Sequence, residues 1–306
     1  NIKMAGVLKH HRVIQRIIAP NTCLKSRLVQ YRLLSGSSTD LVVTDKVGKI
    51  FLIGINRPEK RNCVNSQTAA QLVQAFRTFE NDDSLRVAVL HGKGGNFCAG
   101  FDLSQLSEGG VSPENFPDPN DGLGPMGPSK MVFNKPVIAA VSGYAVAGGL
   151  ELSLMCDMRI VEETAIMGVF CRRFGVPLID GGTVRLPALI GLSRAMDMIL
   201  TGRGVSANEA LQMGLANRVV PIGTAVGEAV KIAQTISNFP QECMLRDRKS
   251  AYHATYDAPS HTDAMCYELD NAKHVINLES VQGAGRFVTG AGKGGKFNID
   301  KPTSKL

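Results

Sequence analysis

A carboxylate that follows a glycine-rich turn is the first feature of this chain with the composition of a chemical site. Residues 137–141 read VIAAV, an apolar run typical of a buried strand, and residues 143–149 form a turn of small residues. Residues 150–155 then have helix-compatible composition, with Glu151 near the start. The N–H groups that open a helix have no acceptor within it, and the positive end of the helix dipole lies behind them. Such a turn can stabilise a developing oxyanion, with Glu151 beside it to transfer protons.

A second stretch repeats the arrangement of strand, glycine turn and small residues. Residues 86–103 read RVAVLHGKGGNFCAGFDL, which is a β-rich run, a glycine turn and then AGFDL at 99–103. A single glycine-rich turn is more common in tight packing or in phosphate binding than in oxyanion stabilisation. A second turn of the same kind shifts the balance toward a site for acyl chemistry.

With these two stretches the chain resembles the crotonase (enoyl-CoA hydratase/isomerase) superfamily. That family carries an A-G-x-D-[LI] segment and, later, K-P-V-I-A-A-V-x-G-x-A-x-G-G-x-x-E-L. Here they read AGFDL at 99–103 and KPVIAAVSGYAVAGGLEL at 135–152. The family's opening N-R-P-x-x-x-N motif reads NRPEKRN at 56–62. The resemblance covers roughly residues 41–287, nearly everything outside the two tails.

The resemblance implies an α/β fold: a crotonase-type spiral of ββα units with a C-terminal helical region at about 222–288 that serves trimer assembly. The implied partners are an acyl-CoA thioester substrate and further copies of the chain, in a homotrimer or dimer of trimers. Coenzyme A is then part of the substrate, and no separate cofactor is expected.

The resemblance also assigns roles to site residues. Negative charge gathers on the thioester oxygen when a base removes the α-proton or water adds at the β-carbon. The implied oxyanion donors are the N–H groups of Phe101 and Gly148, each worth about 3 to 4 kcal/mol, with Glu151 as acid/base. Substrate contacts are expected from the basic pair after Pro58 and from residues of the two turns, namely Lys60, Arg61, Cys63, Ala99, Gly100, Asp102, Leu103, Tyr144 and Gly149.

One position departs from the family pattern. Glu151 matches the first of two glutamates that a hydratase of this family uses, and Cys171 stands where the second is expected. A thiol has an ordinary pKa of about 8.5 and is a poor substitute for a carboxylic acid.

Three interpretations of the departure stay open. Glu151 acts alone or with Asp180, which otherwise reads as a turn or helix N-cap residue. Alternatively, Cys171 is a nucleophile or proton donor assisted by Arg172 and Arg173, against the simpler reading of a buried inert cysteine. In the third interpretation the chain binds acyl-CoA and catalyses nothing, because fold does not fix function.

Composition places the chain in the globular class. Its 306 residues are 44% hydrophobic, enough for a core in one domain or two. No apolar run reaches the roughly 18 residues that a membrane-spanning helix needs, so no membrane partner is expected. Seven scattered cysteines form no C-x-x-C pair, which predicts neither a disulfide framework nor a metal site.

The net charge of +7 comes from one end of the chain. Residues 1–39 hold seven Lys or Arg and no acid, while the rest carries 27 basic and 27 acidic residues. A neutral body predicts no nucleic-acid partner. The basic, amphipathic, serine-bearing tail at 1–39 is typical of a mitochondrial transit peptide, with an ordinary basic arm as the alternative.

The C-terminal end of the chain carries a different targeting signal. Residues 289–306 are expected to be a flexible tail, and Ser304-Lys305-Leu306 is a peroxisomal signal. The expected location is therefore an organelle matrix, mitochondrial or peroxisomal or both. Between the tails, residues 40–288 are expected to form the acyl-CoA domain.

Patterning predicts several elements of that body. Residues 41–56 alternate around a Val-Gly-Lys turn and predict a hairpin, and residues 66–80 place apolar side chains on one helical face. Residues 206–209, SANE, form a capping box, and residues 224–286 are helical in composition. Residues 107–130, rich in Gly, Pro and Asp, predict no helix or strand and form a candidate lid or a passive loop.

Overall fold

The computed structural model describes residues 40–109 and 122–294. The predictions for the basic tail at 1–39 and for the signal at 304–306 lie outside the described residues. So does the middle of the insert, at 110–121.

The main sheet has six strands in the order β1-β2-β3-β4-β6-β9. All neighbours are parallel except β1 and β2, whose antiparallel pairing runs from Val42 opposite Ile55 to Val47 opposite Ile50. The hairpin predicted at 41–56 is therefore confirmed. The strands are β1 (Val42–Val47), β2 (Ile50–Ile55), β3 (Val87–Gly92), β4 (Val137–Val141), β6 (Met158–Glu162) and β9 (Arg218–Val220).

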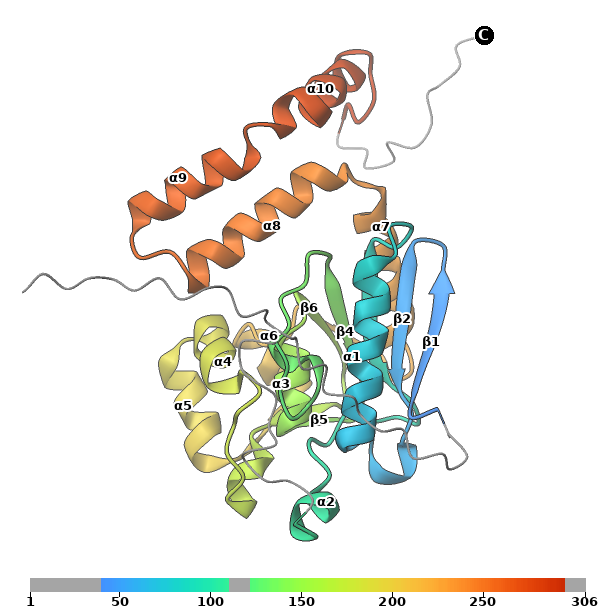
Figure 1. The fold of residues 1–306 in the computed structure, drawn as a ribbon, viewed down its shortest axis with the longest axis vertical. Coiled ribbons are helices and arrows are strands. Elements are labelled where there is room, and N and C mark those ends of the chain that lie inside the picture. The colour runs from blue at the N-terminus through green and yellow to red at the C-terminus, as the bar shows by residue number, and fades with distance from the viewer. Residues whose placement is uncertain (1–39, 110–121, 295–306) are drawn as a thin grey trace, which may run out of the picture. The chain divides into compact units, whose positions relative to one another are not determined.

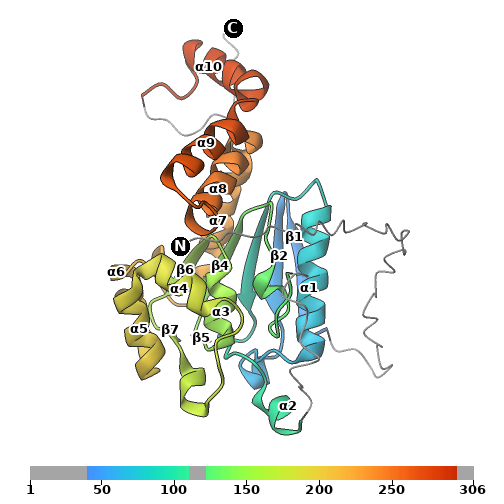
Figure 2. The same cartoon turned by 60° about the vertical axis from the view of Figure 1, so that its left-hand side comes forward.

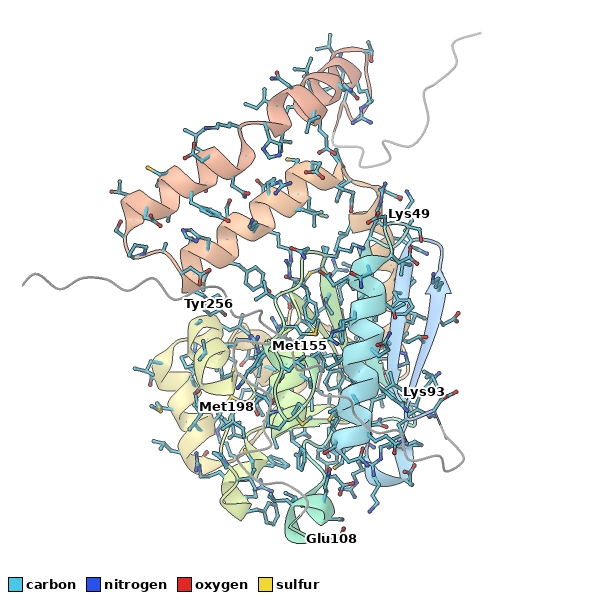
Figure 3. The ribbon with its side chains drawn as sticks, viewed as in Figure 1. Lys49, Lys93, Glu108, Met155, Met198 and Tyr256 are labelled. Carbon is cyan, nitrogen blue, oxygen red and sulfur yellow. The ribbon has the colours of Figure 1, made fainter. Side chains whose placement is uncertain are left out.

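Both faces of this sheet are covered, which explains why β4 is apolar at every position. Val137 and Ala139 face a core shared with α1 (Ser66–Asn81), while Ile138 and Ala140 face a core shared with α7 (Ala225–Asn238). Figure 1 shows α1 in front of the strands and α7 behind them. The helix predicted at 66–80 is confirmed, and Leu72, Phe76 and Phe79 on its inner face are fully buried. Figure 3 shows the side chains that these elements carry.

A second, three-stranded sheet consists of β5 (Tyr144–Val146), β7 (Ile166–Gly168) and β8 (Gly204–Ser206). Strand β5 lies inside the segment 143–149 that composition predicts as a turn only, so this prediction was incomplete. Three residues are too few for the alternation that identifies a strand. An isolated bridge between Cys98 and Ala145 joins this sheet to the loop that follows β3.

Short helices lie between the strands, and two of them, α3 and α6, lead from the second sheet to the main sheet. The N-cap of the predicted capping box is confirmed, since the Ser206 hydroxyl accepts the N–H of Glu209 at 3.3 Å at the start of α6. The Glu209 carboxylate instead accepts from Arg203, so the reciprocal half of the box was wrong. The helices are α2 (Leu103–Ser107), α3 (Gly148–Leu154), α4 (Gly182–Ile190), α5 (Leu192–Thr201) and α6 (Ala207–Gln212), with 3-10 turns η1 (Pro58–Lys60), η4 (Pro128–Lys130) and η5 (Phe170–Phe174).

Residues 122–130, the described C-terminal end of the insert at 107–130, are packed against the rest of the protein. Residues 126–129 are buried, and η4 forms one 3-10 turn there. The prediction that this insert contributes no element was wrong for residues 128–130.

The C-terminal part is helical, as its composition predicts. It consists of α7, α8 (Gln241–Tyr256), α9 (His261–Ala272), the π-helical turn η6 (Ile276–Ser280) and α10 (Val281–Val288). Helices α8 and α9 run side by side in both ribbon views (Figures 1 and 2). Among the described residues, no helix is long and apolar enough to cross a membrane.

Asp157, the residue before β6, connects α8 to the sheet through hydrogen bonds. Its Oδ1 accepts from Arg248 Nε at 2.8 Å and from the Tyr252 hydroxyl at 2.9 Å. Its Oδ2 accepts the N–H of Val137 at 2.8 Å. The Arg248 and Asp157 side chains are only 15% and 17% exposed, so their charges are poorly screened by solvent.

Replacement of Asp157 by alanine should therefore lower the free energy of unfolding by about 2 kcal/mol or more, because Arg248 is left half-buried without its carboxylate. Urea unfolding at fixed protein concentration measures this. Asp270→Ala, which breaks an exposed pair with Lys273, is the matched control and should cost less than about 0.5 kcal/mol. Equal midpoints for the two variants would show that Asp157 does not fasten α8.

Candidate active site

The turn between β5 and α3 has a conformation that few residues adopt. Ala147 has φ 54° and ψ −127°, in a region that is unfavourable for a residue with a Cβ. Its N–H donates to the Gly168 carbonyl at 2.9 Å, and its own carbonyl accepts the N–H of Glu151 at 3.2 Å. These bonds hold the strained residue and turn the chain directly from β5 into α3.

Gly149 in this turn and Gly100 in the loop after β3 must be small, because backbone of the other segment lies against each of them. A Cβ added to Gly149 would lie 2.0 Å from the Cys98 carbonyl oxygen. One added to Gly100 would lie 3.1 Å from the Gly148 nitrogen. The loop that carries AGFDL is therefore in direct contact with the turn that precedes Glu151. A single site that uses both segments, as predicted from the sequence, requires this contact.

Two N–H groups in these turns have no acceptor among residues 40–109 and 122–294. Val64 pairs with the loop on both sides of Phe101, because its N–H donates to the Gly100 carbonyl and its carbonyl accepts the N–H of Asp102. The Phe101 N–H itself has no acceptor in the part of the chain that the structure describes. The same holds for the N–H of Gly148, the first residue of α3. Their role as oxyanion donors stays a prediction.

Glu151 is buried near these two N–H groups, and backbone N–H groups around the start of α4 hold its carboxylate. The residue is 2% exposed, and its Oε1 accepts the N–H groups of Asp180 at 2.9 Å and Gly182 at 2.8 Å. Burial, with the nearby charge of Asp180, raises the Glu151 pKa to about 7, although the two N–H bonds and Arg185 oppose the shift. A carboxyl group that titrates near neutral pH is suited to both accept and return a proton.

Asp180 lies next to Glu151 and is also buried. Its Oδ1 accepts the Met126 N–H at 3.0 Å and the hydroxyl of Ser129. Burial raises the Asp180 pKa despite these bonds. The N-cap of α4 is Gly181, so the alternative reading of Asp180 as a helix cap was wrong.

Cys171 is buried in η5, close enough for the charge of Glu151 to affect it. Burial, followed by that charge, raises the pKa of the Cys171 thiol. Arg172 and Arg173 donate to the carbonyl groups of Ile199 and Gly202 at the end of α5. The surroundings therefore disfavour the thiolate that a nucleophilic cysteine needs.

Some of the residues predicted to contact coenzyme A are exposed, and others are packed inside the protein. Lys60 and Arg61 are exposed around η1, and the Arg61 guanidinium lies 5.6 Å from the centre of the partly exposed Tyr144 ring. Leu103 is exposed and Cys63 is half-buried. The remaining predicted contacts are Ala99, Gly100 and Gly149, all in the two packed turns, and Asp102.

Asp102 is occupied by a structural ion pair. Its Oδ2 accepts from Arg57 at 2.8 Å, and its Oδ1 accepts the N–H of Ser104 to cap α2. Although burial alone would raise the pKa of Asp102, Arg57 holds it below its ordinary range. A role for this carboxylate in substrate binding stays a prediction.

Four supporting residues were missed at the level of sequence. Arg57 and Asn62 belong to the NRPEKRN motif, but their partners were not predicted. The Asn62 side chain donates to the carbonyl groups of Lys93 and Asn96 and accepts the N–H of Arg57, so it fixes the loop around η1. Met126 and Ser129 lie in the insert, where only the Gly-Pro-Met-Gly pattern indicated a turn.

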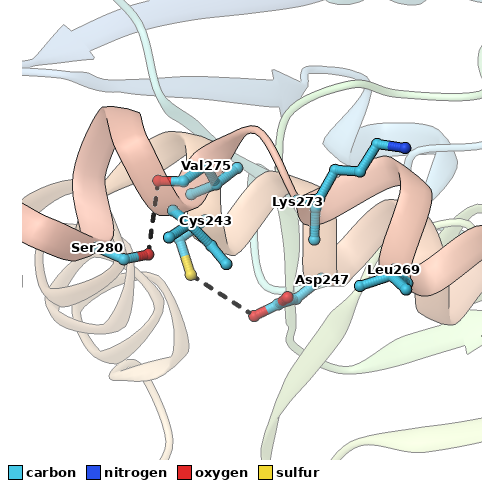
Figure 4. A pocket seen from close by; sticks show the side chains of 8 residues that line it. Cys243, Asp247, Leu269, Lys273, Val275 and Ser280 are labelled. Carbon is cyan, nitrogen blue, oxygen red and sulfur yellow. Dashed lines mark hydrogen bonds between the residues drawn. The ribbon is translucent and has the colours of Figure 1, made fainter.

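A hollow lies between α8, α9 and η6 (Figure 4). It has a volume of about 170 Å3, and its polar lining is Cys243, Asp247, Lys273 and Ser280. None of these residues belongs to the elements that carry Glu151 or its neighbours. Within the described ranges, no three His, Cys, Asp or Glu side chains are arranged to hold a metal ion.

Comparison with known proteins identifies the family of this chain. The family model described as enoyl-CoA hydratase/isomerase matches residues 45–290. A protein of Dictyostelium discoideum named "Probable enoyl-CoA hydratase, mitochondrial" is 34% identical over 215 residues, covering 70% of this chain and 76% of the relative. A carnitinyl-CoA dehydratase of Proteus mirabilis is 38% identical over 194 residues, covering 62% of this chain and 72% of the relative.

Solved structures give the same result for the fold. The crystal structure of an enoyl-CoA hydratase from Mycobacterium marinum superimposes with a TM-score of 0.75 at 30% identity, covering 81% of this chain and 96% of the other. The α/β architecture predicted from the resemblance is therefore that of the solved crotonase-type structures. The chain belongs to the enoyl-CoA hydratase/isomerase family of the crotonase superfamily.

Proposed function

We propose that this protein is an acyl-CoA thioester enzyme of enoyl-CoA hydratase/isomerase type. The observation that carries the proposal is the placement of Glu151, a buried carboxyl group with a pKa near 7, in the first turn of the helix that begins at the free N–H of Gly148. The relatives of this chain are named as hydratases and dehydratases of CoA thioesters, which supports the same class of reaction for this protein.

The proposed mechanism stabilises a thioester enolate. The N–H groups of Phe101 and Gly148 bind the thioester oxygen as it gains negative charge, with the dipole of α3 behind Gly148. Ionised Glu151 either removes a substrate proton and returns it to another carbon, or takes a proton from the water whose oxygen adds at the β-carbon and then delivers that proton to the α-carbon of the enolate. The first route moves a double bond, and the second adds water across it.

Asp180 is the second carboxyl group within reach, which supports an alternative in the same family. In that alternative an isomerase or other lyase uses Glu151 together with Asp180, whose pKa is also raised by burial. A non-catalytic acyl-CoA-binding protein is the remaining alternative, although such a protein has no need of a buried carboxyl group beside the oxyanion donors.

The same proposal covers binding and assembly. Lys60 and Arg61 would bind the phosphates of coenzyme A, with the other contacts predicted above lining its path. No cofactor other than the substrate's own coenzyme A is proposed. The C-terminal helices at about 222–288 would join copies into a trimer or a dimer of trimers, and exposed apolar side chains on α9 and α10 support this, including Leu269, Val281, Phe287 and Val288.

Location follows from the two tails. The basic segment at 1–39 and the mitochondrial name of one relative support the mitochondrial matrix, and Ser304-Lys305-Leu306 supports the peroxisome. Residues 40–288 between them would act as one acyl-CoA domain.

The proposed reaction is tested with full-length protein and Glu151→Gln. Each is incubated with short, medium and branched 2-enoyl- and 3-enoyl-CoA thioesters in deuterated water, and products are read by mass spectrometry. We expect added water or a shifted double bond with wild type, and a rate about 100- to 10,000-fold lower with Glu151→Gln, since the variant cannot exchange a proton. Glu163→Gln, at an exposed glutamate, is the control and should match wild type.

Equal rates for wild type and Glu151→Gln on every thioester, with CoA esters still bound, would contradict the enzyme assignment. That result would support the binding-protein alternative.

A second prediction concerns Cys171. Cys171→Ser should keep kcat/KM within about threefold of wild type, because the buried thiol stays protonated and supplies no nucleophile. Steady-state rates with the best thioester measure this, with exposed Cys266→Ser as the control. A loss as large as that of Glu151→Gln would instead make Cys171 a catalytic residue.

A further inference from the structure

A tight turn of the insert lies directly against the proposed oxyanion site. Residues 124–127, Gly-Pro-Met-Gly, close on themselves, since Gly124 and Gly127 each donate an N–H to the other's carbonyl at 2.9 and 2.8 Å. We call these four residues the Met126 turn. A Cβ on Gly124 would lie 2.3 Å from Asp180 Oδ1, and one on Gly127 would lie 2.5 Å from the Ala69 carbonyl oxygen. The Met126 turn is therefore tightly packed between α1 and Asp180.

The side chain at the tip of this turn covers Gly148. Met126 is completely buried, and a Cβ on Gly148 would lie 2.6 Å from its sulfur atom. Met126 thus forms a wall beside one of the two proposed oxyanion donors. A shift of this turn would change the space around the thioester oxygen.

Asp180 holds the Met126 turn in place through one oxygen atom. Oδ1 accepts both the Met126 N–H and the Ser129 hydroxyl, so one atom fixes the tip of the turn and the residue that follows it in η4. Arg185 adds a second connection, since its Nη1 donates to the Ser129 carbonyl at 2.6 Å and to the Asp180 carbonyl at 3.3 Å. On its other side, the Asp180 N–H donates to Glu151.

We propose that Asp180 is a positioning residue for the proposed reaction, whose carboxylate holds Met126 against Gly148 while its N–H holds the Glu151 side chain. One residue then fixes both the wall beside the oxyanion donor and the orientation of the acid/base group. This role rests on the proposed function of the site, but the hydrogen bonds that define it can be measured without turnover.

Positioning and proton transfer place different demands on the Asp180 side chain, because positioning needs only an oxygen atom that accepts hydrogen bonds. Both donors end on Oδ1, and the amide oxygen of asparagine can accept the same two bonds. A proton donor must instead be a carboxyl group. Asparagine therefore preserves the positioning role and removes the proton-transfer role, whereas alanine removes both.

The kinetic test uses full-length Asp180→Asn and Asp180→Ala with the thioester that wild type converts best, at a pH above the Glu151 pKa of about 7 so that Glu151 is ionised. We expect Asp180→Asn to keep kcat/KM within about threefold and Asp180→Ala to lose about tenfold or more, as for loss of hydrogen bonds to a charged group. Ser129→Ala removes one of the two bonds and should fall between them. The matched control is Ser237→Ala, a buried serine on α7 whose hydroxyl donates to the Gln234 carbonyl, which should match wild type.

The structural test is hydrogen exchange at the Met126 amide. Exchange should be slow in wild type and Asp180→Asn, and about tenfold or more faster in Asp180→Ala, because the amide loses its acceptor. If Asp180→Ala does not fold, Ser129→Ala takes its place, with a smaller increase of about threefold. Absence of turnover in wild type would count against the proposed function and leave this measurement unaffected.

Two results would overturn the proposal. If Asp180→Asn loses as much activity as Asp180→Ala while Met126 exchange stays slow, then Asp180 transfers protons. If Met126 exchange in both Asp180→Ala and Ser129→Ala equals that of wild type, then Asp180 does not hold the turn.

Discussion

Backbone atoms of two distant segments approach each other here more closely than any side chain would permit. Gly149 lies against the Cys98 carbonyl, and Gly100 lies against the Gly148 nitrogen, so neither glycine has room for a Cβ. Because β3 and β4 are parallel neighbours in the main sheet, the loops that follow them emerge at the same edge and can meet in this way. In the described part of the chain, the N–H groups of Phe101 and Gly148, which lie in these two loops, have no acceptor.

The electrostatics of the site follow from the same packing. Glu151 is placed one turn beyond Gly148, where the sheet and α4 exclude water, and this burial raises its pKa to about 7. The N–H groups of Asp180 and Gly182 offset part of the cost of the charged form. Asp180 opposes that effect with its own charge, so Glu151 can hold or release its proton with little cost near neutral pH.

Local pattern predicted the parts of this protein whose signals are local. The hairpin at 41–56, the helix at 66–80 and the Ser206 cap were found because periodicity and capping chemistry operate within a few residues. The motifs AGFDL and KPVIAAVSGYAVAGGLEL identified the two turns that meet. Strand β5 was not predicted, since its three residues make sense only as partners of β7.

The support around Glu151 could not be predicted from pattern, because its contacts join distant segments. Asp180 bonds Met126 and Ser129, which are more than fifty positions earlier in the chain. Arg57 pairs with Asp102 across 45 positions. Sequence spacing carries no information about such pairs, so the role of Asp180 as an anchor of the Met126 turn became visible only in three dimensions.

The central claim is that Glu151 is a carboxyl group poised between its two protonation states beside the free N–H groups. Its titration can be followed directly by the infrared carboxyl band, as the difference between wild type and Glu151→Gln in the absence of substrate. We predict a midpoint near pH 7, raised from the ordinary value of 4.5 by burial and by Asp180. A midpoint at or below 4.5 would contradict it, because Glu151 would then be permanently ionised and unable to return a proton at neutral pH.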